Sequence, residues 1–264
     1  MPNVDVDGAS VAYRVEGRGP ALVLVAGTGG NLESNWAHLM PALSARYTVV
    51  RVDYAGSSGD TRDDVAELTI ERLAGQVAAA INSAGIDRFH LLGYSLGSSI
   101  ALQTAVIFAD RVRSLTLLAG FASGRDTRFA LQSALWLELI RHDLRQFARL
   151  IILTGLSPQA LSSFQESDVQ LWVDAICSNN DWEGISRQIV LDASLDVSAL
   201  LPRLNVPTLS IGCEHDHMVP PQHARHLAAA IQGARYRELP CGHLAPFEQP
   251  DAFLDLLNDF ISQH

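Results

Sequence analysis

Apolar runs and amphipathic stretches alternate along the first part of the chain. Four strands are predicted there, at 21–26, 47–53, 89–94 and 112–118. The run 21–26 is apolar at every position, which is typical of a strand covered on both faces of a parallel sheet. At 68–84 apolar residues recur at helical spacing, and Gly85 ends that pattern. Alternating strands and helices predict a parallel sheet with right-handed crossovers.

The same alternation continues at both ends of the chain. Residues 4–15 alternate apolar and polar side chains around Asp7-Gly8, which predicts a β-hairpin. Further strands are predicted at 206–212 and 234–239. Helices are predicted at 36–43, 222–231 and 250–261. We therefore expect an α/β protein with a mostly parallel, doubly wound sheet of about eight strands and helices on both faces.

The alternation breaks between 121 and 204, where no stretch has the pattern of a sheet strand. Helices are predicted instead, at 128–141, 144–154, 158–178 and 182–190. The aromatic residues of this region are Phe121, Phe129, Trp136, Phe147, Phe164, Trp172 and Trp182. Most are expected to pack these helices onto the rest of the protein, whereas two or three would line an apolar pocket.

The pattern most informative about function is G-x-S-x-G at 93–97. It joins a predicted strand to a predicted helix at 96–109, and this order is the context of a nucleophile elbow. Ser95 would then sit on a strained turn with its hydroxyl accessible, and the flanking glycines would avoid collisions between strand and helix. The helix N-terminus would favour a developing negative charge. The alternative is an ordinary polar turn residue.

A serine nucleophile needs a base and a third group that orients the base. Asp216 follows the predicted strand 206–212, and His243 follows the predicted strand 234–239. Loops at the carboxyl ends of neighbouring parallel strands converge, so Ser95, Asp216 and His243 can meet although they lie far apart in sequence. Serine, acid and histidine also follow one another in the order that this kind of elbow requires.

On these residues the chain resembles the α/β-hydrolase fold superfamily, in its compact form with a lid, over nearly all of its 264 residues. In that family the acid lies in G-x-x-D-x-x-x-P, which Gly212, Asp216 and Pro220 match. The base lies in a Gly-His pair, which Gly242-His243 match.

The same resemblance implies the domain organisation. The hydrolase core would comprise 1–120 and 205–264, and 121–204 would form a helical lid over the site. A lid of this kind shapes the substrate pocket, so the resemblance leaves the substrate open.

The resemblance also implies an oxyanion hole made of two backbone amides. One is the N–H of Leu96, after the nucleophile, and the other is by alignment the N–H of Thr28. The loop that holds Thr28 is usually H-G-x-G-G and here reads A-G-T-G-G at 26–30. Ala26 replaces the family histidine, but the donor is main chain, so we expect the hole to survive. The turn at 53–60 lacks the family's arginine, so its structural ion pair near the site is expected to be missing.

Three neighbours of Asp216 offer alternative chemistry. Glu214 matches the family position of the acid less well, and a solvated face suits it better. His215 and His217 flank Asp216, but this spacing without converging partners is a weak metal signal, and no metal is expected.

Composition narrows the choice of partners. A formal net charge of −10 argues against binding to nucleic acids and anionic membranes. Cys177, Cys213 and Cys241 lack metal-ligand spacing and are expected to be free thiols in a reducing compartment. Neither a signal-peptide pattern nor an apolar run of membrane-spanning length is visible, so we expect a cytoplasmic location.

The residues together predict a serine hydrolase that acts on an ester, lactone or thioester of an apolar small molecule without a cofactor. Ser95 would attack, His243 would act as base and then as acid, and Asp216 would orient His243. Two alternatives stay open. The same triad could serve C–C bond hydrolysis, perhydrolysis, or cyclisation or release of a natural-product chain. The fold could also serve as a non-catalytic ligand receptor.

Overall fold

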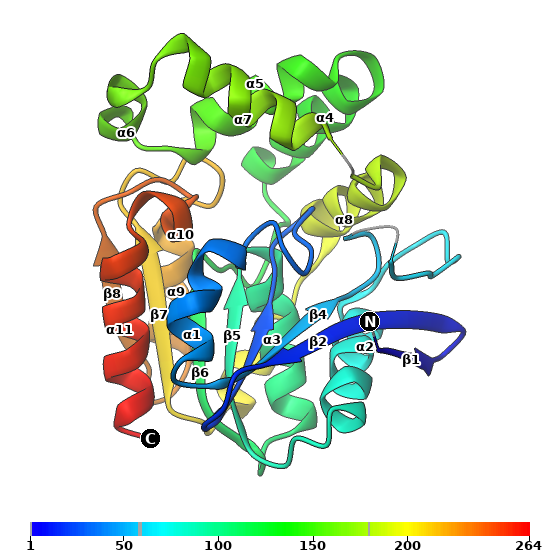
Figure 1. The fold of residues 1–264 in the computed structure, drawn as a ribbon, viewed down its shortest axis with the longest axis vertical. Helices are drawn as coiled ribbons and strands as arrows, with labels where there is room; N and C mark the ends of the chain where they lie inside the picture. The colour runs from blue at the N-terminus through cyan, green and yellow to red at the C-terminus, as the bar shows by residue number, and fades with distance from the viewer. Residues whose placement is uncertain (1, 58–59, 179) are drawn as a thin grey trace.

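The computed structural model describes residues 2–57, 60–178 and 180–264 (Figure 1). Within them lies an eight-stranded sheet with the order β1-β2-β4-β3-β5-β6-β7-β8. The strands are β1 (Asn3–Val6), β2 (Ala9–Glu16), β3 (Ala21–Val25), β4 (Thr48–Asp53), β5 (Phe89–Tyr94), β6 (Val112–Leu118), β7 (Thr208–Cys213) and β8 (Arg235–Leu239). β2 pairs antiparallel with β1 and β4, and the other neighbours pair parallel. The predicted α/β fold is therefore confirmed.

The strands lie where short apolar runs predict them. β5 and β7 are buried at every position, as expected for strands in the middle of a covered sheet. The predicted hairpin joins β1 to β2, and both of its turn residues have positive φ, 48° at Asp7 and 81° at Gly8. Such angles match the twist of the two strands.

Helices cover both faces of the sheet (Figure 1). On one face lie α2 (Ile70–Ser83), α3 (Leu96–Ile107) and α9 (Gln222–Ala230), and on the other lie α1 (Met40–Ser44) and α11 (Pro250–Ser262). In α2 the fully buried Leu73, Val77 and Ile81 are spaced four residues apart, so one stripe of the helix packs on the sheet.

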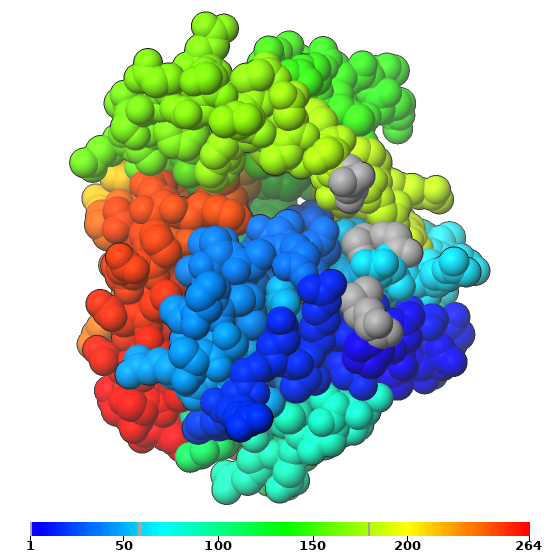
Figure 2. All heavy atoms as spheres, in the orientation of Figure 1, coloured from blue at the N-terminus to red at the C-terminus, as the bar shows by residue number. Residues whose placement is uncertain are grey.

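Between β6 and β7 the chain forms helices, as predicted. They are α4 (Thr127–His142), α5 (Leu144–Gly155), α6 (Pro158–Ser163), α7 (Glu166–Cys177) and α8 (Trp182–Ser194). We call α4–α8 the helical insertion. Figure 1 shows α4–α7 beyond one end of the sheet, with α8 between them and the sheet. Figure 2 shows a recess in the surface between the helical insertion and the rest of the protein.

The prediction of a single helix at 158–178 is wrong. Phe164 and Gln165 are extended and separate α6 from α7. Gln165 begins α7 with a capping box: the Asp168 carboxylate accepts the Gln165 N–H at 2.8 Å, and the Gln165 side chain accepts a backbone N–H in return. These bonds satisfy groups that a continuous helix would satisfy within itself.

Two other short helices also differ from the prediction. The helix predicted at 36–43 is divided into a 3₁₀ turn, Ala37–Leu39, and α1, which has Pro41 in its first turn. Proline fits there because the first helical N–H groups have no partner within the helix. The short helix α10 (Ala245–Glu248), after the histidine loop, was not predicted.

The structure also bears on three smaller predictions. Cys177, Cys213 and Cys241 are free thiols, as expected. No helix in the described part of the chain is long and apolar enough to cross a membrane, and the cytoplasmic location stays a prediction. The turn predicted at 53–60 includes residues 58–59, which lie outside the described residues.

Candidate active site

Ser95 lies on the turn between β5 and α3. Its φ of 54° and ψ of −123° are unusual for a residue with a side chain, and they give the strained turn of a nucleophile elbow. A Cβ at Gly93 would collide with the Gly97 carbonyl, and a Cβ at Gly97 would collide with the Ala26 carbonyl. Both flanking positions therefore require glycine.

The side chains of Ser95, His243 and Asp216 form one hydrogen-bonded chain. Ser95 Oγ lies 3.1 Å from His243 Nε2, and His243 Nδ1 lies 2.6 Å from Asp216 Oδ2. A carboxylate only accepts hydrogen bonds, so Nδ1 carries the imidazole proton and Nε2 is left to accept the proton of the Ser95 hydroxyl. All three residues are buried, and Ser95, the most exposed of the three, has 8% of its surface exposed. The structure thus brings together the three residues predicted from the sequence.

The loop after β7 fixes the Asp216 carboxylate. Its Oδ1 accepts the N–H groups of Met218 and Val219, both at 2.8 Å, while Oδ2 binds His243. Both carboxylate oxygens therefore have partners, as buried polar atoms require. Glu214, the alternative acid, is exposed.

Two side chains that the sequence did not point to, Tyr94 and Glu248, support the loop that holds His243. The Tyr94 hydroxyl donates to the His243 carbonyl at 2.9 Å, and the two rings lie 5.3 Å apart. Burial raises the pKa of Tyr94 well above its usual range, so the phenol remains a donor. The Glu248 carboxylate accepts the Gly242 N–H at 3.0 Å. Tyr94 occupies a variable position of G-x-S-x-G, so the motif does not mark it.

The loop after β3 packs against Ser95. A Cβ at Gly27 would lie 3.0 Å from Ser95 Cβ, so a side chain there would crowd the serine. Among the described residues, the backbone N–H groups of Thr28 and Leu96 have no hydrogen-bond acceptor. Leu96 is the first residue of α3, where free N–H groups are expected. Within the described part of the chain, no protein group therefore competes for either of the two predicted donors.

Core side chains order the first half of this loop. The Tyr54 hydroxyl donates to the Ala26 carbonyl at 2.7 Å, and Asn35 Oδ1 accepts the Gly27 N–H at 3.2 Å. These two hydrogen bonds hold the loop in place at Ala26, the position of the family histidine, and at the residue after it.

Helix α8 binds the second half of the loop, and sequence reasoning missed this contact. The Thr28 hydroxyl donates to Asp192 Oδ2 at 2.6 Å, and the Gly29 N–H donates to Gln188 Oε1 at 2.8 Å. Asp192 is buried, and burial raises its carboxyl pKa to about 7, although the Thr28 hydrogen bond opposes the shift. The helix predicted at 182–190 ends before Asp192.

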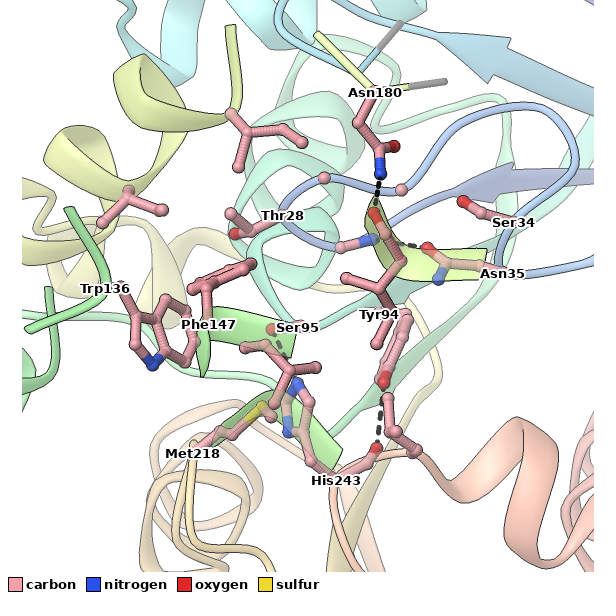
Figure 3. Close-up of a pocket in the computed structure, with 18 of the residues that line it drawn as sticks. Thr28, Ser34, Asn35, Tyr94, Ser95, Trp136, Phe147, Asn180, Met218 and His243 are labelled. Atoms are coloured by element: carbon pink, nitrogen blue, oxygen red, sulfur yellow. Dashed lines mark hydrogen bonds between the residues drawn. The ribbon is translucent and has the colours of Figure 1, made fainter. Parts of the chain in front are cut away.

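A cavity of about 680 Å³ lies over Ser95 and His243, and its walls are mostly apolar. Figure 3 shows Trp136, Phe147 and Met218 on one side of Ser95. Of the Phe and Trp residues between 121 and 204, all but Phe164 line the cavity: Phe121, Phe129, Trp136, Phe147, Trp172 and Trp182. The expectation of only two or three was too low, because several helices of the insertion turn aromatic side chains toward the same cavity.

The described residues contain no group of three or more His, Cys, Asp or Glu side chains that could hold a metal ion. His217, one of the two histidines weighed as metal ligands, is exposed, and His215 is partly buried.

Comparisons with known proteins agree with this geometry. A profile of the family described as "alpha/beta hydrolase fold" matches residues 20–250. The pyrrolizixenacetamide deacetylase of Xenorhabdus hominickii is 46% identical over 261 residues, which cover 99% of this chain and 98% of the relative. The enol-lactonase of Burkholderia xenovorans LB400 superposes with a TM-score of 0.86 at 27% identity, over 99% of this chain and 100% of that one. A hydrolase from Pseudomonas aeruginosa PA01 gives 0.85 at 28% identity, over 98% and 96%.

The chain belongs to the α/β-hydrolase fold family. Its elbow, its strand order and its similarity to proteins named as hydrolases agree, and the chain is accordingly a hydrolase.

Proposed function

We propose that this hydrolase cleaves an acyl bond of an apolar small molecule through Ser95, His243 and Asp216. The observation that supports the proposal most is the hydrogen-bonded chain from Asp216 through His243 to Ser95, which ends at an apolar cavity. A serine hydroxyl is a weak nucleophile, and a base held in this way is what activates it.

Each residue then has a defined step. His243 Nε2 takes the proton from Ser95 Oγ as that oxygen attacks the carbonyl carbon, and Asp216 stabilises the imidazolium. The N–H groups of Thr28 and Leu96 bind the oxyanion of the tetrahedral intermediate. His243 returns the proton to the leaving group, which leaves an acyl group on Ser95. Water, deprotonated by His243, releases the acid and restores the serine.

The cavity supports an apolar substrate. The helical insertion contributes most of its aromatic walls, and in this proposal residues 121–204 act as a lid that encloses the apolar part of the substrate. The side chains Asn35 and Asn180 lie on the opposite side of the cavity from Trp136 and Phe147 (Figure 3). A molecule with one apolar part and one polar end fits such a site.

An amide is the second candidate substrate, beside the ester, lactone or thioester predicted from the sequence. The observation that favours it is the 46% identity, over almost the full length of both chains, to the protein named pyrrolizixenacetamide deacetylase. The same residues serve both reactions, because His243 protonates a leaving amine as it protonates a leaving alcohol.

Labelling with a fluorophosphonate, followed by intact-mass measurement, tests the nucleophile. We expect one adduct on the protein and none on Ser95→Ala. A second serine labelled at the same rate in the variant would place the nucleophile elsewhere, and absence of labelling and turnover in the parent would favour a non-catalytic receptor.

Three substrate series then test the bond and the apolar part: nitrophenyl esters of lengthening acids, acetates of lengthening alcohols, and N-acetyl arylamines. Each buried methylene is worth about 0.8 kcal/mol, so specificity should rise a few-fold per carbon in one ester series until the cavity is filled. Rates independent of size in both ester series would contradict an apolar subsite. Product analysis separates hydrolysis from the cyclisation and C–C cleavage that the triad also permits.

A further inference from the structure

We infer that Gln188 and Asp192 of α8 are positioning residues that hold the oxyanion loop, residues 26–30, with its Thr28 amide beside Ser95. The inference rests on the proposed function, because it assigns these residues to the oxyanion site of that reaction. Neither residue touches the reacting atoms in this assignment. Both act through the backbone of the loop.

Gln188 uses every polar atom of its side chain to join two loops. It is fully buried, its Oε1 accepts the Gly29 N–H at 2.8 Å, and its Nε2 donates to the Ala55 carbonyl at 2.8 Å and to Ser57 Oγ at 3.3 Å. The buried amide therefore fixes Gly29 relative to the turn that follows β4.

Asp192 lies four residues after Gln188, so the two side chains project from the same face of α8. Its Oδ2 accepts the Thr28 hydroxyl at 2.6 Å, while Oδ1 has no partner among the described residues. The hydroxyl of Thr28 and the N–H of Gly29 are therefore both bound by α8. One of these two groups belongs to the Thr28 side chain and the other to the next residue along the backbone, so both are a few bonds from the Thr28 amide.

Side chains outside the helical insertion do not replace the contacts of Gln188 and Asp192 with the loop. Tyr54 and Asn35 bind the loop at Ala26 and Gly27, the first half of the loop. Among the described residues, the side chains that hydrogen-bond to 28 and 29 are those of α8. Without α8, residues 28 and 29 would keep, among the described hydrogen bonds, only the turn that the Gly30 N–H closes with the Gly27 carbonyl at 2.8 Å, a bond within the loop that does not tie it to the rest of the protein.

Position matters at this site because an oxyanion donor acts over a short range. Removing one donor costs about 10²- to 10³-fold in turnover, and a misplacement of about 1 Å can cost on the order of 10²-fold. The donor binds the tetrahedral state more strongly than the substrate, so its displacement should lower kcat and leave KM nearly unchanged.

The test compares Gln188→Leu and Asp192→Leu with the parent on one activated ester, with active sites counted by fluorophosphonate titration. We expect kcat per active site to fall about 10- to 100-fold and KM to stay within about threefold. A trifluoromethyl ketone, whose adduct with Ser95 carries an oxyanion, should bind more weakly by the same factor as kcat/KM falls. A merely structural defect would reduce the number of active sites and leave the affinity of the remaining ones unchanged.

Arg187→Leu is the matched control on the same helix. Arg187 Nη1 donates to the carbonyls of Asp63 at 3.0 Å and Val65 at 2.6 Å, so the variant breaks another contact of α8 and leaves the oxyanion loop untouched. We expect kcat within about threefold of the parent. An equal loss in this variant would overturn the inference, because any weakening of α8 would then suffice.

Two conservative variants keep the test decisive if a leucine variant fails to fold. Asp192→Asn retains an oxygen that accepts the Thr28 hydroxyl and should keep kcat within about threefold. Thr28→Val removes the hydroxyl but keeps the amide, and should match Asp192→Leu, with no added loss when the two are combined.

The two proposals fail in different ways. A parent protein with neither labelling nor turnover would refute the proposed function. A labelled and active parent, with kcat and ketone affinity unchanged in Gln188→Leu and Thr28→Val, would refute only the positioning role.

Discussion

The two sides of the candidate site are built from different parts of the chain. On the histidine side, Asp216 is fixed by the backbone of its own loop, and the His243 carbonyl by Tyr94. These groups all belong to the sheet and the loops at the ends of its strands. On the oxyanion side, Thr28 and Gly29 are bound by Asp192 and Gln188, which belong to the helical insertion.

The helical insertion also meets the histidine side, but there the core supplies the side chain. Glu248 of α10 accepts the Gly242 N–H at 3.0 Å and the N–H of Ser157, the residue before α6, at 2.9 Å. The Leu244 N–H also donates to the Gly155 carbonyl of α5 at 2.8 Å, so the insertion contacts the histidine loop through its backbone, whereas it binds the oxyanion loop through the side chains of α8. Changes in the insertion should therefore alter oxyanion binding more than base strength.

Ser95→Ala should have the largest effect, because it removes the atom that both sides of the site serve. We expect turnover to fall about 10⁴- to 10⁶-fold. Circular dichroism and the melting temperature should remain those of the parent, since a methyl group fits where the hydroxymethyl group was. Turnover equal to that of the parent would remove Ser95 from the mechanism.

Asp216→Asn breaks the histidine side alone. The amide can present N–H to His243 Nδ1 and so favour the tautomer that cannot accept the Ser95 proton, which should cost about 10⁴-fold in kcat with little change in KM. Glu214→Gln is the matched control, two residues away and exposed, and should behave like the parent. If Glu214→Gln is the crippling change, the acid has been misassigned.

The histidine side could be predicted from the sequence because it follows from the order of the strands. Apolar runs located β5, β7 and β8 to within about two residues, and parallel neighbours place the ends of their strands together. Asp216 lies three residues after the end of β7 and His243 four residues after the end of β8, so the short loops that hold them stay at this edge of the sheet. Motif spacing then selected Asp216 over Glu214, and the structure buries the first and exposes the second.

The oxyanion side could not be predicted to the same depth. The contacts of Thr28 with Asp192 and of Gly29 with Gln188 join residues about 160 positions apart, and no sheet pairing relates them. Polar residues on an amphipathic helix normally face solvent, so Gln188 and Asp192 resemble surface positions. The break at Phe164 also lacks glycine or proline, the usual signals of a helix end.

Thr28→Pro breaks the oxyanion side alone. Proline has no N–H, so one of the two proposed donors is lost and kcat should fall about 10²- to 10³-fold, less than in the histidine-side variant. Thr28→Ser is the control, because it keeps both the amide and the hydroxyl that Asp192 accepts. A folded Thr28→Pro protein with full activity would show that the second donor lies elsewhere in the loop.

The smallest expected effect is on the free energy of unfolding, through Asp192 on the oxyanion side. It tests that side of the site without an activity measurement. Burial raises the pKa of Asp192 to about 7 from an ordinary value of 3.8. Between about pH 4 and pH 7 the folded protein therefore holds a proton that the unfolded chain has released, so the free energy of unfolding falls as pH rises through this window. Asp192→Asn carries no such group, and its unfolding free energy should rise relative to the parent by on the order of 2 to 4 kcal/mol from pH 4 to pH 8.

Urea unfolding of both proteins at several pH values measures this difference, and groups that titrate alike in the two cancel. Tyr54, which faces Asp192, does not titrate in the window, because burial first and then the charges of Asp192 and Asp53 raise its pKa well above its usual range. A constant difference between Asp192→Asn and the parent would mean that the Asp192 carboxyl is ionised across the whole range. The hydrogen bond to Thr28 would then be charge-assisted, and Asp192→Asn would lower kcat by more than threefold.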